Sequence, residues 1–291
     1  MSDGSGAELE AVAAPRPCDL CGGTRHEPLL HKRGANYLLC ADCGLIQSDL
    51  DVSAAGEENL DYFGDALDKY SRRHYAPKHQ FRLSKRLRKF APYRKLNRIL
   101  EVGANVGGFV HRAREEGWEA VGVEPVAACC EVARERHGVE LVCALLEEAG
   151  LPEASFDAVF TNAVFEHLPS PRVILAEIVR LLRPGGVVFI DTVNWDSYTR
   201  RNLGADWKLI DPSHHVVLFT PETLRRYCED AGLEVVALDT RGVRFLPNES
   251  ERPRGLAKLR DELRKAPLSL ATRFNGKGDS VEILARKPER G

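Results

Sequence analysis

A glycine-rich turn between two acidic residues is the part of the sequence best suited to holding a cofactor. Residues 98–102 favour a β-strand and contain Glu101, and a helix-like segment follows after Gly103, Gly107 and Gly108. The free N–H groups at the start of such a helix can receive a polar ligand group. Glu124 follows Gly103 by 21 residues, where the second strand of a nucleotide-binding unit places an acid on a ribose diol. The segment therefore predicts a nucleoside-containing cofactor.

The same residues distinguish between nucleoside cofactors. Asn105 stands where a dinucleotide fingerprint needs glycine for close approach to a pyrophosphate. Glu101 would repel a pyrophosphate, but it can hold an ammonium group directly or through water. S-adenosylmethionine (SAM) has an ammonium group, a carboxylate and a ribose, and it has no phosphate. The turn therefore favours SAM over a nicotinamide dinucleotide.

Several segments carry a resemblance to a known family. Residues 101–107 resemble motif I of class I SAM-dependent methyltransferases, with Asn105 in place of the usual middle glycine, and residues 155–169 and 181–190 look like the fourth and fifth strands of that fold. Residues 206–224 are similar to one branch that often carries an N-terminal four-cysteine module. The resemblance covers residues 18–46 and 96–287. It implies a SAM site made by Glu101, Gly103, Asn105, Gly107, Glu124, Leu145 and Asn162.

One position departs from the family pattern. Many relatives have an acidic residue after the third strand that contacts the adenine amino group, and Leu145 falls at that position here. Backbone groups or Glu147 would then have to contact the adenine edge. The departure leaves the adenine contact open and does not change the cofactor.

Four of the eight cysteines have the spacing of a metal site. Cys18 and Cys21 form one pair and Cys40 and Cys43 a second, with 18 residues between the pairs. Two Cys-x-x-Cys pairs at this separation predict a tetrahedral zinc site. Four protein ligands leave no open position, so the zinc would be structural. Two disulfide bonds are the alternative, and the other four cysteines are expected to be small hydrophobic residues.

The candidate catalytic residues lie after the fourth strand and in the segment that follows the core. Open α/β sheets bind ligands at the carboxyl ends of their strands, where Asn162, Glu166 and His167 are expected. His167 is the candidate general base because imidazole titrates near neutral pH, and a local hydrogen bond at a helix start is its other interpretation. His215, beside His214, could reach the same pocket.

Strand and helix patterns alternate through residues 98–191, which predicts an α/β fold: a doubly wound, Rossmann-like, mostly parallel sheet of seven strands with a small N-terminal zinc ribbon. Residues 233–240 and 280–286 would supply the last two strands, and residues 220–223 begin a helix with a threonine N-cap. The predicted division is a disordered tail (1–16), the zinc ribbon (17–46), a helical connector (47–95) and the methyltransferase domain (96–291). Residues 243–278 could form a lid.

Bulk composition excludes some classes of function. The formal net charge is −2, so the chain lacks the overall positive charge of a nucleic-acid-binding protein. No apolar run approaches the roughly 20 residues that a membrane span needs, and no signal peptide is visible at the start. We therefore expect a cytoplasmic protein, and the sequence leaves its oligomeric state open.

Residues 69–95 contain many lysines and arginines and no acid. They could be a solvated helix face, a phosphate-binding face for a small substrate, or an RNA-binding face. We expect a SAM-dependent methyltransferase that acts on a small-molecule acceptor, sugar-like or a secondary metabolite. The alternatives are an RNA methyltransferase that uses the zinc ribbon and the basic connector, a nucleotide-sugar C-methyltransferase, and a SAM-binding partner subunit without catalysis.

Overall fold

The computed structural model describes residues 16–50, 67–244 and 256–289. Its centre is a six-stranded sheet in the order β5 (Glu119–Val123), β4 (Arg98–Val102), β6 (Phe156–Asn162), β7 (Leu182–Val193), β10 (Ser280–Arg286) and β9 (Glu234–Arg241). The first four of these strands are parallel, and β10 pairs antiparallel with both β7 and β9. This confirms the predicted doubly wound, mostly parallel fold.

The prediction of seven strands was wrong for the described residues. The expected strand beside β5 is reduced to one parallel bridge between Val123 and Val142. Val142 donates to Gly122 O and accepts from Glu124 N, and the chain then turns so that Ala144 N donates back to Val142 O. That turn ends the pairing after one residue, which leaves six strands.

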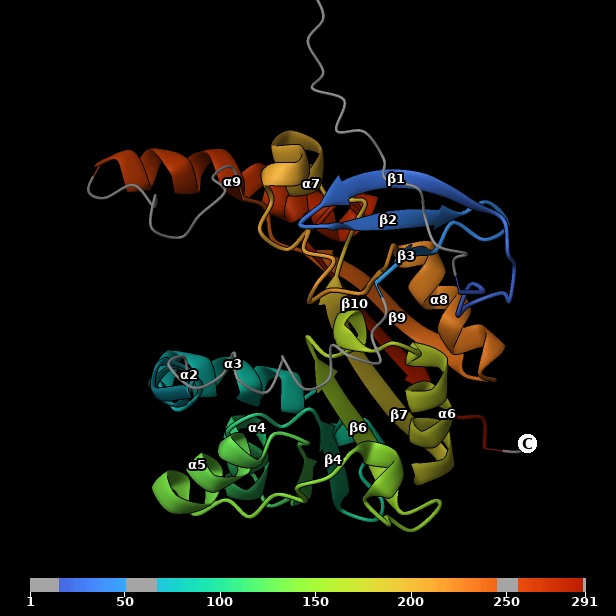
Figure 1. The fold of residues 1–291 in the computed structure, drawn as a ribbon. Coiled ribbons are helices and arrows are strands. Elements are labelled where there is room, and N and C mark those ends of the chain that lie inside the picture. The colour runs from blue at the N-terminus through green and yellow to red at the C-terminus, as the bar shows by residue number, and fades with distance from the viewer. Residues whose placement is uncertain (1–15, 51–66, 245–255, 290–291) are drawn as a thin grey trace, which may run out of the picture.

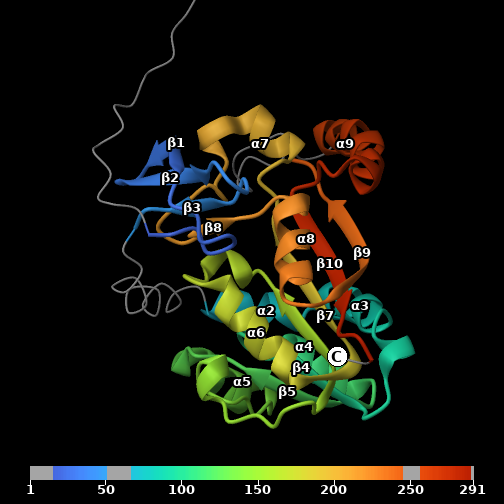
Figure 2. The same cartoon turned by 90° about the vertical axis from the view of Figure 1, so that its right-hand side faces the viewer.

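Helices cover both faces of the six-stranded sheet. On one face α3 (Pro77–Leu87) and α4 (Gly108–Glu115) share a core with β4, β6 and β7, where the ring of Phe160 stacks on Phe109 at 4.0 Å and on Phe189 at 5.6 Å between centroids. On the other face α6 (Pro171–Leu181) and α8 (Pro221–Asp230) pack against β6, β7 and β10. Figure 2 views this second face, with α6 and α8 in front of the strands and α3 behind them.

Local sequence signals account for several element boundaries. Thr220 and Thr223 form the reciprocal cap that starts α8, as predicted. Leu83 and Leu87 are buried on α3, and Phe90 is fully buried just beyond its end. The predicted strands at 233–240 and 280–286 are confirmed as β9 and β10 within one residue at each end.

The N-terminal cysteine region forms a second, antiparallel sheet: β1 (His26–Lys32), β2 (Ala35–Cys40), β3 (Ile46–Ser48) and β8 (Val217–Leu218). Its last strand comes from a segment some 170 residues further along the chain, which the sequence did not predict. Figure 1 shows β1–β3 (blue) beyond the upper end of the six-stranded sheet. Tyr37 and Trp207 are almost fully buried in the small core between the two parts.

The segment predicted as a lid contains α9 (Leu256–Asn275), which contacts β9 through a hydrogen bond from the Thr240 hydroxyl to the Thr272 carbonyl at 2.5 Å. Residues 245–255 of that segment lie outside the described residues, as do residues 1–15 of the predicted tail and 51–66 of the connector. Among the described helices, none is both long enough and apolar enough to cross a membrane.

Candidate cofactor and acceptor site

The four parallel strands bring their carboxyl ends to one edge of the sheet. Glu101 is the last residue but one of β4, Glu124 directly follows β5, and Asn162 is the last residue of β6. This edge is where open α/β sheets bind their ligands. The predicted cofactor residues therefore gather where a ligand is expected.

Glu101 is the most unusual of these residues because it is buried and incompletely paired. Its carboxylate accepts the backbone N–H of Val110, but its Oε2 atom has no hydrogen-bond partner among the described residues. Burial raises the pKa of Glu101 well above its usual range, and the negative charge of Glu124 adds to the effect. An unpaired buried carboxylate oxygen costs free energy unless a donor or cation reaches it. The site thus fits a ligand with a positively charged donor.

Glu124 is held differently, by the backbone of the glycine turn. One carboxylate oxygen accepts Asn105 N at 2.8 Å and the other accepts Val126 N at 3.0 Å. Burial raises the pKa of Glu124, and these two N–H groups lower it in part. Each oxygen still has a second lone pair, so the carboxylate can also accept hydroxyl groups from a ligand.

The turn has a backbone shape that explains its residues. Asn105 has φ 49°, in the left-handed region that asparagine tolerates better than most residues, and its Oδ1 accepts Val106 N at 2.9 Å. The asparagine can therefore replace the middle glycine of the family pattern. Gly103 has φ 70°, and a Cβ there would lie 2.5 Å from Cγ2 of Val164. This position consequently requires glycine for both conformation and space.

A tyrosine in the chain before β4 contacts the glycine turn. Tyr75, between α2 (Leu67–His74) and α3, donates its hydroxyl to the Val106 carbonyl at 2.9 Å. Its ring stacks on His137 with centroids 3.4 Å apart. The tyrosine therefore braces the glycine turn.

Two further predicted cofactor residues are more exposed. Leu145 is 51% exposed and immediately precedes the turn of helix Leu146–Glu148. Asn162 accepts a hydrogen bond from Arg86 of α3 at 2.5 Å. The structure thus places Asn162 at the predicted edge, with α3 as its partner.

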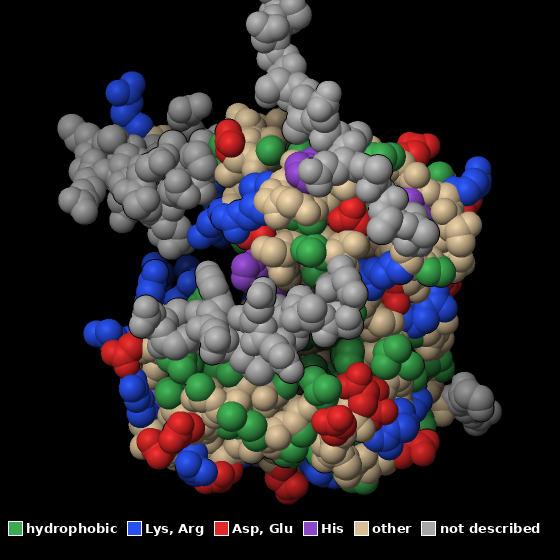
Figure 3. Space-filling view, in the orientation of Figure 1, with side chains coloured by type: hydrophobic (Ala, Val, Ile, Leu, Met, Phe, Trp, Pro, Cys, Tyr) green, Lys and Arg blue, Asp and Glu red, His purple; other side chains and the backbone are tan. Residues whose placement is uncertain are grey.

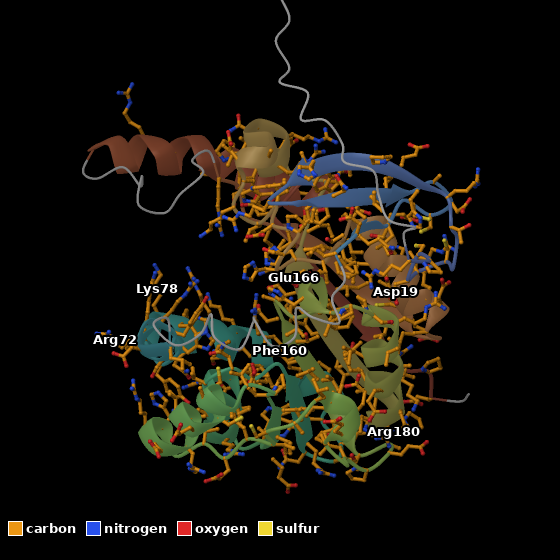
Figure 4. All side chains as sticks on the ribbon, viewed as in Figure 1. Asp19, Arg72, Lys78, Phe160, Glu166 and Arg180 are labelled. Carbon is orange, nitrogen blue, oxygen red and sulfur yellow. The ribbon has the colours of Figure 1, made fainter. Side chains whose placement is uncertain are left out.

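The three predicted catalytic residues come together above this edge. A carboxylate oxygen of Glu166 and one ring nitrogen each from His167 and His215 lie within 4.8 Å of one another. The two imidazole rings meet edge to face with centroids 4.7 Å apart. Glu166 is buried and accepts the Thr192 hydroxyl at 2.6 Å. Figure 4 shows Glu166 at the end of the central strands that points toward β1–β3.

Backbone carbonyls fix the protonation of both rings. Nδ1 of His167 lies 2.7 Å from the His214 carbonyl, and Nδ1 of His215 lies 2.7 Å from the Leu209 carbonyl. A carbonyl can only accept, so Nδ1 of each ring carries a proton, and whenever the ring is neutral Nε2 is the nitrogen that can accept one. Burial lowers the pKa of His215, which favours its neutral form.

The N-terminal sheet positions part of this cluster, which the sequence did not reveal. The hydroxyl of buried Tyr37 donates to the His215 carbonyl at 2.7 Å. Arg33 pairs with Asp211, which lies four residues before His215 in the chain. Asp19, labelled in Figure 4, accepts the Tyr227 hydroxyl at 2.9 Å and also receives the Ser170 hydroxyl. The cysteine region is therefore joined to the segment that carries His215.

The four predicted metal-ligating cysteines form one cluster. Their sulfur atoms all lie within 4.8 Å of one another, and two of the pairs, Cys18–Cys43 and Cys21–Cys40, are 3.4 and 3.5 Å apart. These distances are too long for disulfide bonds, and all four cysteines are free. Gly23 N donates to the Cys21 sulfur at 3.4 Å, as in a zinc knuckle. The donor set and its turns fit a four-thiolate zinc site.

Part of the basic segment is used inside the protein. Arg86 pairs with Asp191 and Glu282, and Lys89 pairs with Glu282 at 3.0 Å. Burial raises the pKa of Asp191 to about 6, and the Arg86 charge opposes that rise. Figure 3 shows the surface hollowed between α9 and α2–α3, with Lys and Arg side chains on both sides. The other basic residues of the segment are exposed, and basic side chains lie beside this hollow.

Comparison with known proteins points to one family. A family model described as a methyltransferase domain matches residues 72–238, which is more than half of the chain. The malonyl-[acyl-carrier protein] O-methyltransferase of Serratia marcescens is 30% identical over 132 residues, covering 45% of this chain and 51% of that protein. The ubiquinone biosynthesis O-methyltransferase of Aromatoleum aromaticum is 32% identical over 153 residues, covering 48% and 65%. The chain thus spans about half to two thirds of these curated relatives.

Solved structures agree on the fold. A SAM-dependent methyltransferase of Thermotoga maritima superposes with a TM-score of 0.53 at 22% sequence identity, covering 78% of this chain and 99% of that one. At this identity the likeness concerns the fold alone.

Proposed function

We propose that this chain, which belongs to the methyltransferase domain family, transfers a methyl group from SAM to a small-molecule acceptor. The observation that carries the proposal is the buried Oε2 of Glu101, which has no partner in the described part of the chain, beside a glycine turn in left-handed conformation. A catalytic protein and a non-catalytic SAM-binding subunit would share that feature. The converging side chains of Glu166, His167 and His215 favour catalysis.

Each part of the cofactor site has a distinct task in this proposal. Glu101 holds the ammonium group, Glu124 accepts the ribose hydroxyls, and Gly103, Asn105 and Gly107 let the backbone approach. Leu145 covers one face of the adenine, and Asn162 borders the pocket. SAM, when bound, supplies an electrophilic methyl group. The protein then has to orient the acceptor and exclude water.

The acceptor is proposed to bind beside His167. Its Nε2 is the basic nitrogen and can take the acceptor's proton, while Glu166 and His215 favour the resulting positive charge. The relatives named above are O-methyltransferases, which supports an oxygen acceptor. A sugar-like compound or a secondary metabolite is our preferred class, and a nucleotide-sugar acceptor methylated at carbon is the second candidate because basic side chains lie beside the hollow between α9 and α2–α3.

We assign residues 17–46 to a structural zinc ribbon bound through Cys18, Cys21, Cys40 and Cys43, residues 47–95 to a helical connector, and residues 96–291 to the methyltransferase domain, with residues 243–278 as a lid. The ribbon supports the site because Tyr37 holds the segment that carries His215. Zinc therefore has a role in architecture and none in the methyl transfer itself.

Transfer of label from tritiated SAM tests the substrate class. We expect label to enter a small-metabolite or nucleotide-sugar extract and to fall by at least 100-fold in His167→Ala, since general acid–base catalysis contributes roughly 10²–10⁴-fold. His26→Ala is the matched control, because His26 lies on β1 and, among the described residues, its ring bonds only to the nearby Thr24 carbonyl.

Total cellular RNA serves as the competing acceptor. RNA binding would weaken steeply with salt as counterions are released. Label in RNA together with salt-sensitive binding would overturn the small-molecule assignment. Charge reversal at Arg72 and Arg73, which are exposed, would then abolish binding, whereas Arg86 and Lys89 are left unchanged because they pair with Asp191 and Glu282.

A further inference from the structure

Three hydrogen-bond acceptors converge at the cluster of Glu166, His167 and His215. A carboxylate oxygen of Glu166 and one nitrogen of each ring lie within 4.8 Å of one another. Nδ1 of each ring donates to a backbone carbonyl, so in a neutral ring Nε2 is the nitrogen left to accept, and an ionised carboxylate only accepts. Acceptors facing one another at short range repel unless a cation lies between them. The arrangement therefore calls for either an extra proton or a metal ion.

Several features favour a metal ion. Histidines that ligate metals almost always donate their other ring N–H to a carbonyl or carboxylate, and both rings do so here. The carboxylate is oriented by a second contact, the Thr192 hydroxyl at 2.6 Å. Two ligand atoms on one ion lie at most about 4 Å apart, because each bond is about 2.1 Å long. The ligand atoms of this cluster lie within 4.8 Å of one another, so only a small movement of the side chains would bring them to bonding distance of one ion.

We propose that Glu166, His167 and His215 bind one divalent first-row transition-metal ion at the acceptor side of the methyl-transfer site. Two imidazoles and one carboxylate form a ligand set that suits Fe²⁺, Co²⁺ or Zn²⁺ and leaves coordination positions open. Oxygen atoms of the acceptor would fill those positions. The site is chemically distinct from the four-cysteine site, which has no open position and selects zinc by its thiolates.

This inference rests on the proposed function and changes the role of His167. With the ion bound, Nε2 of His167 is a ligand and cannot be the base. The ion then lowers the pKa of the acceptor hydroxyl, whose proton leaves to water. Methyl transfer is expected to rise with added metal and to show saturation at one ion per chain.

Co²⁺ alone is the probe, added to full-length protein whose cysteine site already holds zinc. We expect one Co²⁺ per chain by calorimetry, without the intense near-ultraviolet absorbance of a thiolate-bound cobalt ion. His215→Gln and Glu166→Gln should each weaken binding by at least 10-fold. Thr192→Val, which removes only the orienting hydroxyl, should weaken it by about 10-fold. His26→Gln should bind Co²⁺ like the wild type.

Equal Co²⁺ affinity in the wild type, His215→Gln and Glu166→Gln would overturn the metal site, and so would no uptake beyond the zinc. SAM affinity, measured on the same samples, separates this outcome from failure of the proposed function. Intact SAM binding and methyl transfer without Co²⁺ uptake would remove the metal ion and leave His167 as the base.

Discussion

Replacing Glu101 with glutamine should weaken SAM binding and at the same time stabilise the unliganded protein. A hydrogen bond to a charged group contributes about 1.5–3 kcal/mol, so the affinity should fall roughly 10- to 150-fold. The free protein should gain stability because a buried carboxylate with an unpaired oxygen is replaced by a neutral group. Calorimetry with SAM and chemical denaturation measure the two effects separately.

The gain in stability should depend on pH. The pKa of Glu101 is raised in the folded protein, so the folded state binds more protons than the unfolded state above about pH 4.5. The carboxylate therefore destabilises the fold increasingly as the pH rises from about 4.5 to the raised pKa that Glu101 has in the folded protein. The stabilisation in Glu101→Gln should accordingly be larger at pH 8 than at pH 5.

Glu282→Gln is the matched control, because Glu282 is equally buried but pairs with Arg86, Lys89 and Arg241. It should lose about 1–3 kcal/mol of stability, since the partly exposed Arg86 and Lys89 lose the charge of their buried partner. Unchanged SAM affinity in Glu101→Gln, or a loss of stability equal to that of Glu282→Gln, would contradict the role given to Glu101.

Removal of one zinc ligand should have the largest effect on stability. Structural zinc contributes about 10–16 kcal/mol in small zinc-finger peptides, which is comparable to the whole stability of a domain, about 5–15 kcal/mol. Cys40→Ser should therefore lose the bound zinc and unfold β1–β3 at room temperature. Elemental analysis should find one zinc per chain in the wild type and less than a tenth of that in the variant.

The same variant should reduce methyl transfer, because β3 pairs with β8 and Tyr37 holds the segment that carries His215. Cys143→Ser is the control: Cys143 is exposed and lies outside the cluster. Zinc-free wild-type protein with an unchanged melting temperature would contradict the zinc site, as would a Cys40→Ser variant that behaves like Cys143→Ser.

The glycine turn was predictable from sequence because its constraints are local. A positive φ at Gly103 and Gly107, a strand before the turn and a helix after it are all encoded within about fifteen residues. Asn105 fits the same logic, since its side chain tolerates the left-handed conformation. The paired cysteines were predictable for the same reason, because the two-residue spacing brings the sulfur atoms of each pair close together.

Contacts between distant segments were not predictable in this way. Nothing near Val217 indicates that it pairs with Gln47 in the N-terminal sheet, because two residues of strand carry too little pattern. The reduced third strand depends on where the chain turns after Val142. His167 and His215 could be named as candidates, but the carbonyls that fix their tautomers are backbone atoms without a sequence signature.

Calorimetric titration of the wild-type protein with S-adenosylhomocysteine, the demethylated product of SAM, and separately with NAD tests the central claim most directly. The account predicts saturable binding of one S-adenosylhomocysteine per chain and no binding of NAD, because Glu101 and Asn105 disfavour a pyrophosphate. Binding of NAD without binding of S-adenosylhomocysteine would contradict it.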